Sequence, residues 1–143
     1  MIIKLFELNK INVENYKFYL FYGDNEGLKE ETIKNLLEKD YQDKIHRYEE
    51  KEILDNINSF FNSILTKSFF DNEKLIIINR ATDKIKETIE DLIERKPEDI
   101  QVILNSKNLE RKSTLRKIFE KEKSIICVPF YEDNNQTLNS IIS

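Results

Sequence analysis

Glycine, proline, cysteine and histidine are all scarce in this chain of 143 residues. It has two glycines, two prolines, one cysteine, one histidine and no tryptophan. So little glycine and proline excludes collagen-like and low-complexity sequences and is atypical of turn-rich all-β folds. A single cysteine cannot form an internal disulfide, and a single histidine cannot complete a zinc site with it. The composition therefore favours long regular elements in a reducing compartment.

Long apolar runs are also missing. The first ten residues, MIIKLFELNK, become charged too early for a signal peptide, and no segment reaches the ~18 apolar residues of a membrane span. We therefore expect a cytoplasmic protein with no membrane partner.

The balance of charge is acidic, with 23 Lys and Arg against 27 Asp and Glu. A domain that mainly binds the phosphate backbone is usually basic, so any contact with DNA is expected to be weak or indirect. The acidic charge, together with the lack of an apolar stripe beyond the core faces of the helices, predicts a monomer.

What the chain does contain is a regular alternation of short apolar runs and amphipathic segments. The expected strands are 18–22, 44–48, 75–78, 102–104 and 125–128. The expected helices are 26–39, 51–67, one from about 85 that stops before Pro97, one around 115–119 and one that begins near 138. The first ten residues fit either an edge strand or a short helix. Alternation of this kind is typical of βαβ units and predicts a three-layer α/β domain with a parallel sheet of about five strands.

The first strand runs into GDNEGLKEE (23–31), where a phosphate-binding loop would lie. A working loop reads G-x-x-x-x-G-K-[ST], because its glycines let backbone N–H groups approach the phosphates while the lysine and the hydroxyl contact phosphate and Mg²⁺. Gly23 and Lys29 are in register with this pattern. Leu28 replaces the second glycine, and Glu30 replaces the hydroxyl residue. We therefore expect either a plain strand–turn–helix corner or a nucleotide fold that no longer binds nucleotide.

The strand 75–78 bears on whether the chain is an enzyme. Asn79 follows the strand 75–78, where an ATPase would carry an aspartate for Mg²⁺. A receiver domain of two-component signalling would also need an aspartate there, and a lysine where Val128 precedes Pro129. Phosphotransfer is thus disfavoured, and a divergent P-loop NTPase or kinase acting on nucleotide is the alternative function. We expect no catalytic residues, no metal and no cofactor.

Two aromatic side chains, Phe69 and Phe70, are adjacent on the short polar connection after the 51–67 helix. In one interpretation they are structural, with Phe69 extending the apolar stripe of the helix and Phe70 packing against the next strand. In the other, one or both project as an anchor into the pocket of a partner, as exposed aromatics at rigid corners often do.

Other candidate groups are weaker. Cys127 lies inside an apolar strand and is expected to be an inert buried thiol. Four cations gather around the 115–119 helix, where a solvated face is the simpler interpretation and contact with a partner or DNA the alternative. They are Arg111, Lys112, Arg116 and Lys117.

The segments FYLFYGDNEG, SFFDNEKLIII, EDIQVILNS and SIICVPFYE, in this order, resemble the N-terminal domain of the delta-subunit family of bacterial DNA polymerase III. That subunit opens the sliding clamp within the clamp loader. The resemblance covers essentially the whole chain. It implies an AAA+-type domain that supports processive DNA replication without binding or hydrolysing ATP, as a non-catalytic part of the polymerase holoenzyme.

The resemblance also implies a binding site. In the family, a hydrophobic pair at the SFF position inserts into the peptide-binding pocket of the sliding clamp, the beta subunit. This implies clamp binding by Phe69 and Phe70, preceded by Ser68. The family commonly has Leu and then Phe, so the first contact is expected to be bulkier here. The lid and collar domains, which contact the other loader subunits, would follow residue 143, so residues 1–143 are expected to form one domain.

Overall fold

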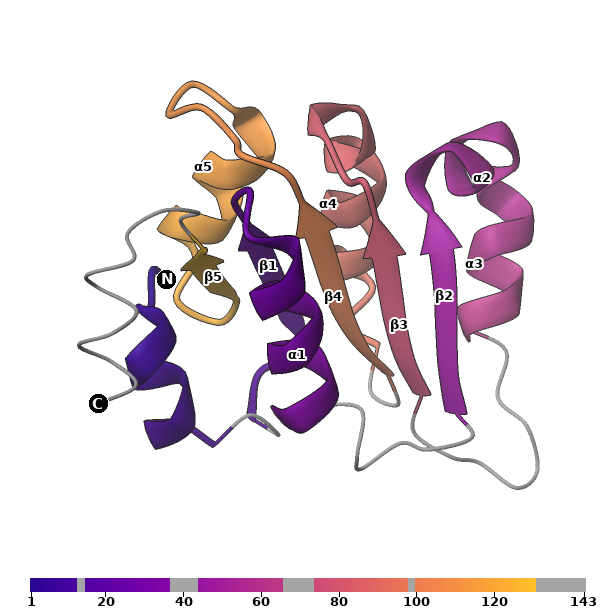
Figure 1. The fold of residues 1–143 in the computed structure, drawn as a ribbon. Helices are drawn as coiled ribbons and strands as arrows, with labels where there is room; N and C mark the ends of the chain where they lie inside the picture. The colour runs from indigo at the N-terminus through magenta and orange to yellow at the C-terminus, as the bar shows by residue number, and fades with distance from the viewer. Residues whose placement is uncertain (13–14, 37–43, 66–73, 98–99, 131–143) are drawn as a thin grey trace.

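The structure is a computed structural model that describes residues 1–12, 15–36, 44–65, 74–97 and 100–130 (Figure 1). Five parallel strands form one sheet in the order β2-β3-β4-β1-β5. The strands are β1 (Phe18–Tyr22), β2 (Ile45–Glu49), β3 (Lys74–Asn79), β4 (Ile100–Ser106) and β5 (Ile126–Pro129). The predicted parallel five-stranded α/β fold is confirmed.

The central strands are buried along their whole length, because helices cover both faces of the sheet. All five residues of β1 and all seven of β4 are buried. Strands of this kind read as continuous apolar runs. The edge strand β2, with the sequence IHRYE, is only partly buried, which explains its weak signal in the sequence.

The helices form the outer layers. A 3-10 helix η1 (Leu5–Lys10) and α1 (Glu26–Leu36) pack on one face, where Ile33 of α1 meets Tyr19 and Phe21 of β1. On the opposite face, Leu20 of β1 joins a larger core with residues of the remaining helices. These are α2 (Glu50–Asp55), α3 (Ile57–Leu65), α4 (Lys86–Glu94), which follows a 3-10 turn η5 (Asp83–Ile85), and α5 (Thr114–Lys121). Figure 1 shows α1 on the side of the sheet away from α3, α4 and α5.

The helix predicted over 51–67 is wrong as a single element. It breaks at Asn56, whose backbone is not helical (φ −154°, ψ 77°) and whose side-chain Oδ1 accepts a hydrogen bond of 3.1 Å from the N–H of Ser59. An asparagine side chain competes in this way with the helical backbone and starts a new helix. Phe60 is buried after the break, but Ile57, which the periodicity placed on the apolar stripe, remains 36% exposed. Residues 66 and 67 lie outside the described residues.

The N-terminal segment combines both of its predicted forms. Ile2 makes an isolated parallel bridge with Cys127, and η1 follows. Cys127 is buried, and burial raises the pKa of its thiol to about 12, as expected for an inert cysteine. The helix predicted from 138 and the last residues of the 26–39 helix lie outside the described residues.

Candidate functional site

The corner after β1 lies at a reversal in the connections of the sheet. The chain leaves β1 for α1 on one face and leaves the neighbouring β4 for α5 on the opposite face. In open α/β sheets, ligands usually bind outside the carboxyl ends of two such strands. Residues 23–31 therefore lie at the position in the fold where a phosphate-binding loop would act.

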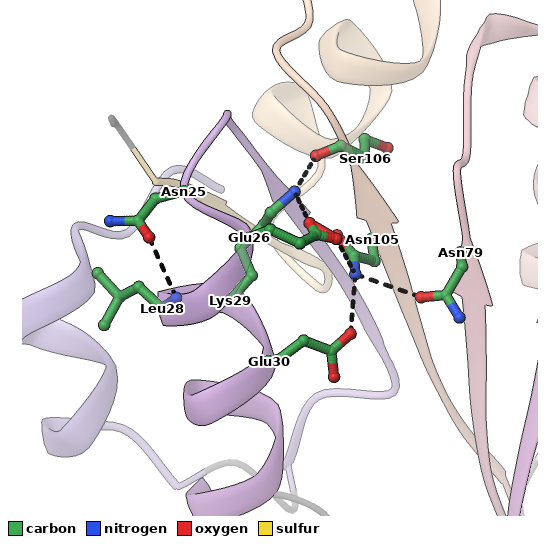
Figure 2. A network of polar contacts seen from close by, with 8 residues as sticks. All are labelled: Asn25, Glu26, Leu28, Lys29, Glu30, Asn79, Asn105 and Ser106. Atoms are coloured by element: carbon green, nitrogen blue, oxygen red, sulfur yellow. Dashed lines mark hydrogen bonds and ion pairs between the residues drawn. The ribbon is translucent and has the colours of Figure 1, made fainter. Parts of the chain in front are cut away.

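Lys29, the lysine in register with a phosphate loop, points into the protein. Its side chain is 1% exposed, and its Nζ donates a hydrogen bond of 2.6 Å to the carbonyl oxygen of Ser106 at the end of β4. The Nζ also lies 3.0 Å from Oε2 of Glu26, one turn earlier on α1. Figure 2 shows both contacts. The ammonium is thus already paired within the chain.

Three backbone donors at the start of α1 are also bonded internally. The N–H of Leu28 donates to Oδ1 of Asn25, and the N–H of Lys29 donates to the carbonyl of Asn25, both at 3.1 Å. The N–H of Glu26 donates to the carbonyl of Asp24 at 2.9 Å. A phosphate at a helix N-terminus needs these N–H groups to be free. The half-buried Leu28 side chain packs against the core beneath α1. It therefore contributes to packing at the position where a phosphate loop has a glycine.

Gly23 is required by the packing of the strands. Its φ is +132°, and a Cβ built there would lie 1.7 Å from the carbonyl oxygen of Phe130. The N–H of Phe130 donates to the carbonyl of Tyr22 at 2.7 Å, and the N–H of Gly23 is 3.2 Å from the carbonyl of Ser106. The close approach of the chain after β5 to the end of β1 therefore explains this glycine without any ligand.

Glu30 and Asn79, which stand where Mg²⁺ ligands would be expected, meet at one amide. Nδ2 of Asn105 lies 3.2 Å from Oδ1 of Asn79, 3.4 Å from Oε1 of Glu30 and 3.3 Å from Oε1 of Glu26 (Figure 2). An amide nitrogen carries two hydrogens, so at most two of these contacts are good hydrogen bonds at once. Within the described part of the chain, no group of three or more His, Cys, Asp or Glu side chains could hold a metal ion.

Sequence reasoning missed Asn105 and Ser106, which are 3% and 1% exposed. Asn105 Oδ1 and Ser106 Oγ are buried without a hydrogen-bond partner. The only signal in the sequence is that two polar residues close the apolar run of β4. Both residues line a surface pocket of about 510 Å³ with Glu26, Lys29, Arg80 and Lys107.

The predicted anchor, Ser68 with Phe69 and Phe70, lies outside the described residues, but both flanks of that connection are described. At the α3 end, the ring of Phe60 packs edge-on against Tyr48 with centroids 5.0 Å apart. The guanidinium of Arg95 lies 4.5 Å from the ring centroid of Phe61. At the β3 end, Nζ of Lys74 donates to the carbonyl of Ser63 at 3.3 Å. The connection therefore begins and ends on packed elements.

Comparison with known proteins identifies the family. A family model described as DNA polymerase III, delta subunit, matches residues 19–128. The chain belongs to the DNA polymerase III delta-subunit family. No curated protein sequence matches it. The Bacillus subtilis DNA clamp loader delta protein is a similar solved structure, with a TM-score of 0.68 and 17% identity over 94% of this chain and 43% of that chain. At this identity the likeness shows the fold, and the chain spans less than half the length of that structure.

This match confirms the family that the sequence segments resemble. The match covers the whole corner at 23–31 and the connection that carries the aromatic pair. Among the described residues, no helix is long and apolar enough to cross a membrane.

The cationic cluster of this delta-family chain is partly structural. Arg116 donates to the carbonyl of Leu109 at 2.9 Å, pairs with Glu120 at 2.7 Å and lies over the ring of Tyr22, 4.9 Å from its centroid. Lys112 lies 3.4 Å from a carboxylate oxygen of Glu110. The exposed Lys112 fits the solvated face of the simpler interpretation, whereas Arg116, whose side chain is 18% exposed, has a structural role that neither interpretation predicted.

Proposed function

We propose that this chain is the clamp-binding and clamp-opening domain of a DNA polymerase III clamp loader. It acts by binding energy and supports processive replication without hydrolysing ATP. The observation that carries the proposal is the delta-subunit match over residues 19–128. The clamp loader title of the similar Bacillus subtilis structure supports it. The internal partners of Lys29 and of the α1 backbone support the absence of a nucleotide.

The proposed contact with the clamp is the side chain of Phe70, together with Phe69 and the preceding Ser68. The connection leaves α3 next to the Phe61–Arg95 contact and enters a central strand. Anchors on rigid supports lose little conformational entropy when they bind. The packed flanks of the connection support the proposal that the pair fills a hydrophobic pocket on one face of the clamp ring.

The direct test is titration of this chain against the sliding clamp of the same organism by calorimetry. Phe70→Ala should abolish or strongly weaken binding. Phe6→Ala is the matched control, because Phe6 is an aromatic of η1 that is 49% exposed on a different element. Binding that is absent in the wild type, or equally weakened by both changes, would contradict the proposal.

The other loader subunits are proposed to contact parts of the protein outside residues 1–143. The similar structure is more than twice as long as the segment it shares with this chain. We propose that residues 1–143 form a single domain, monomeric on its own and active in the cytoplasm, and that lid and collar domains provide loader assembly. This domain alone should bind the clamp but not the remaining subunits, which a pull-down with purified components would show.

A further inference from the structure

A buried ammonium group at the phosphate-loop position needs compensation. Lys29 is 1% exposed, and moving a charge of this kind out of water is costly unless it is paired and hydrogen-bonded. Its two partners are the carbonyl of Ser106 at 2.6 Å and the carboxylate of Glu26 at 3.0 Å. The carbonyl is neutral, so Glu26 supplies the compensating charge.

The Glu26 carboxylate reaches this site from the surface. Its side chain is 61% exposed, and its two oxygens divide between two donors. Oε2 lies 3.0 Å from Nζ of Lys29, and Oε1 lies 3.3 Å from Nδ2 of Asn105. A small oxyanion held by a lysine and an amide would make the same two contacts. Figure 2 shows the carboxylate between these donors, at the end of β4.

We infer that Glu26 occupies, from within the chain, the position of an oxyanion on Lys29, and that this pair pins α1 to the carboxyl end of β4. Lys29 thus has a structural role at the corner of the sheet, with its charge compensated from within α1. The rest of the pocket fits an anion too. Arg80 and Lys107 line it, and the hydroxyl of Ser106 on the same wall is buried without a hydrogen-bond partner.

The inference predicts that a phosphate ion can replace the missing carboxylate. Glu26→Gln removes the charge of an exposed side chain that can turn away into solvent, which leaves the buried Lys29 without a compensating anion. In chloride buffer this variant should melt about 4 °C below the wild type. Inorganic phosphate, compared with chloride at the same ionic strength, should restore at least half of that loss. This rescue does not depend on clamp binding.

Two further variants make the test specific. Glu30→Gln is the matched control, because Glu30 lies one turn later on α1 and contacts the same Asn105 amide at 3.4 Å, while the ion pair of Lys29 is with Glu26. This control and the wild type should respond to phosphate as they do to chloride. Adding Lys29→Met to Glu26→Gln should remove the phosphate rescue, because the cation that binds the ion is gone.

Several outcomes would overturn the inference. They are a Glu26→Gln variant that melts with the wild type, a phosphate effect no larger than that of chloride, equal rescue in Glu30→Gln, or rescue that survives the loss of Lys29. If Glu26→Gln does not fold in chloride, folding in phosphate is the readout, and failure in both buffers counts against the inference.

Discussion

The carboxylate of Asp83 accepts a hydrogen bond of 2.5 Å from the hydroxyl of Ser113, thirty residues later in the chain. The same oxygen accepts a bond of 3.1 Å from the N–H of Leu115. Ser113 is the N-cap of α5, and Asp83 begins the 3-10 turn η5 before α4. One carboxylate therefore joins the connections that follow β3 and β4, and it adds a negative charge at the start of α5, where the helix dipole favours it.

This contact predicts a pH-dependent stability. Burial alone would raise the pKa of Asp83, but hydrogen bonds from Ser113, Leu115 and Thr114 and the nearby Lys86 outweigh it, so the pKa lies below its usual value. A carboxyl group with a lowered pKa stabilises the folded state above its unfolded pKa of about 3.9, and this contribution is lost as the pH falls through the folded value. Asp83→Asn should lower the melting temperature at pH 7, and the difference from wild type should shrink in acid.

Asp91→Asn is the control for that experiment. Asp91 makes an exposed ion pair with Arg95 on α4, at 3.2 Å, and such pairs contribute little. Thermal melts of the three proteins over a pH series provide the measurement. A difference between Asp83→Asn and wild type that stays constant down to the acid range would mean that the charge of Asp83 does not matter.

The two glycines should respond to alanine in opposite directions. Gly23 has a φ of +132° and a backbone oxygen 1.7 Å from the position of a Cβ, so Gly23→Ala should cost at least about 2 kcal/mol of unfolding free energy. Gly27 lies in α1 with no atom within 4 Å of its Cβ position, so Gly27→Ala should stabilise by up to about 1 kcal/mol. Denaturant titrations measure both. Equal effects would refute the packing argument for Gly23.

Phe70→Ala should separate anchoring from core packing. If Phe70 fills a pocket of the clamp, the change should weaken binding roughly thirtyfold or more and leave the melting temperature near that of the wild type. A core role would instead cost about 3–5 kcal/mol of stability. Phe69→Ala should show a mixture of both effects, because the apolar spacing of the sequence predicts that Phe69 continues the stripe of the preceding helix. Clamp titration and thermal melts on the same preparations decide between the two interpretations.

Mg²⁺ and ATP together should leave the melting temperature unchanged. The N–H groups of Leu28 and Lys29 and the ammonium of Lys29 already have partners, and Glu30 places a carboxylate where a hydroxyl would bind Mg²⁺. A ligand at 100 times its dissociation constant would stabilise the protein by about 2.7 kcal/mol, a shift that is easily seen. Micromolar affinity for the nucleotide by calorimetry would favour the divergent NTPase instead.

The sequence predicted the parts of the fold that depend on local pattern. Buried parallel strands produce apolar runs such as FYLFY and LIII, and these lie in β1 and β3. The break at Asn56 escaped prediction because the apolar spacing continues through it, so that periodicity alone reads one helix. The capping bond to Ser59 that ends α2 and starts α3 depends on a single side-chain conformation.

For the candidate site, the sequence predicted only which residues align with the phosphate-loop pattern. The order of residues placed Gly23, Leu28, Lys29 and Glu30 at the corner, and Leu28 and Glu30 indicated a loop unsuited to phosphate. The partners of these residues come from far along the chain. Ser106 is 77 residues from Lys29, and Asn105 is 79 residues from Glu26. No short pattern encodes such contacts, so the direction of the Lys29 side chain could not be read from the sequence.

The close packing of the Phe130 backbone against Gly23 affects how force would pass through the domain. The N–H of Phe130 is bonded to the carbonyl of Tyr22, its carbonyl covers the one glycine that could accommodate it, and its ring lies 5.2 Å from that of Phe21. Tension applied to the chain after residue 130 would therefore act, besides β5, on the end of β1, the strand that leads into α1. Only three residues separate the end of β1 from Glu26, so such a force would reach the Lys29–Glu26 pair over a short stretch of chain.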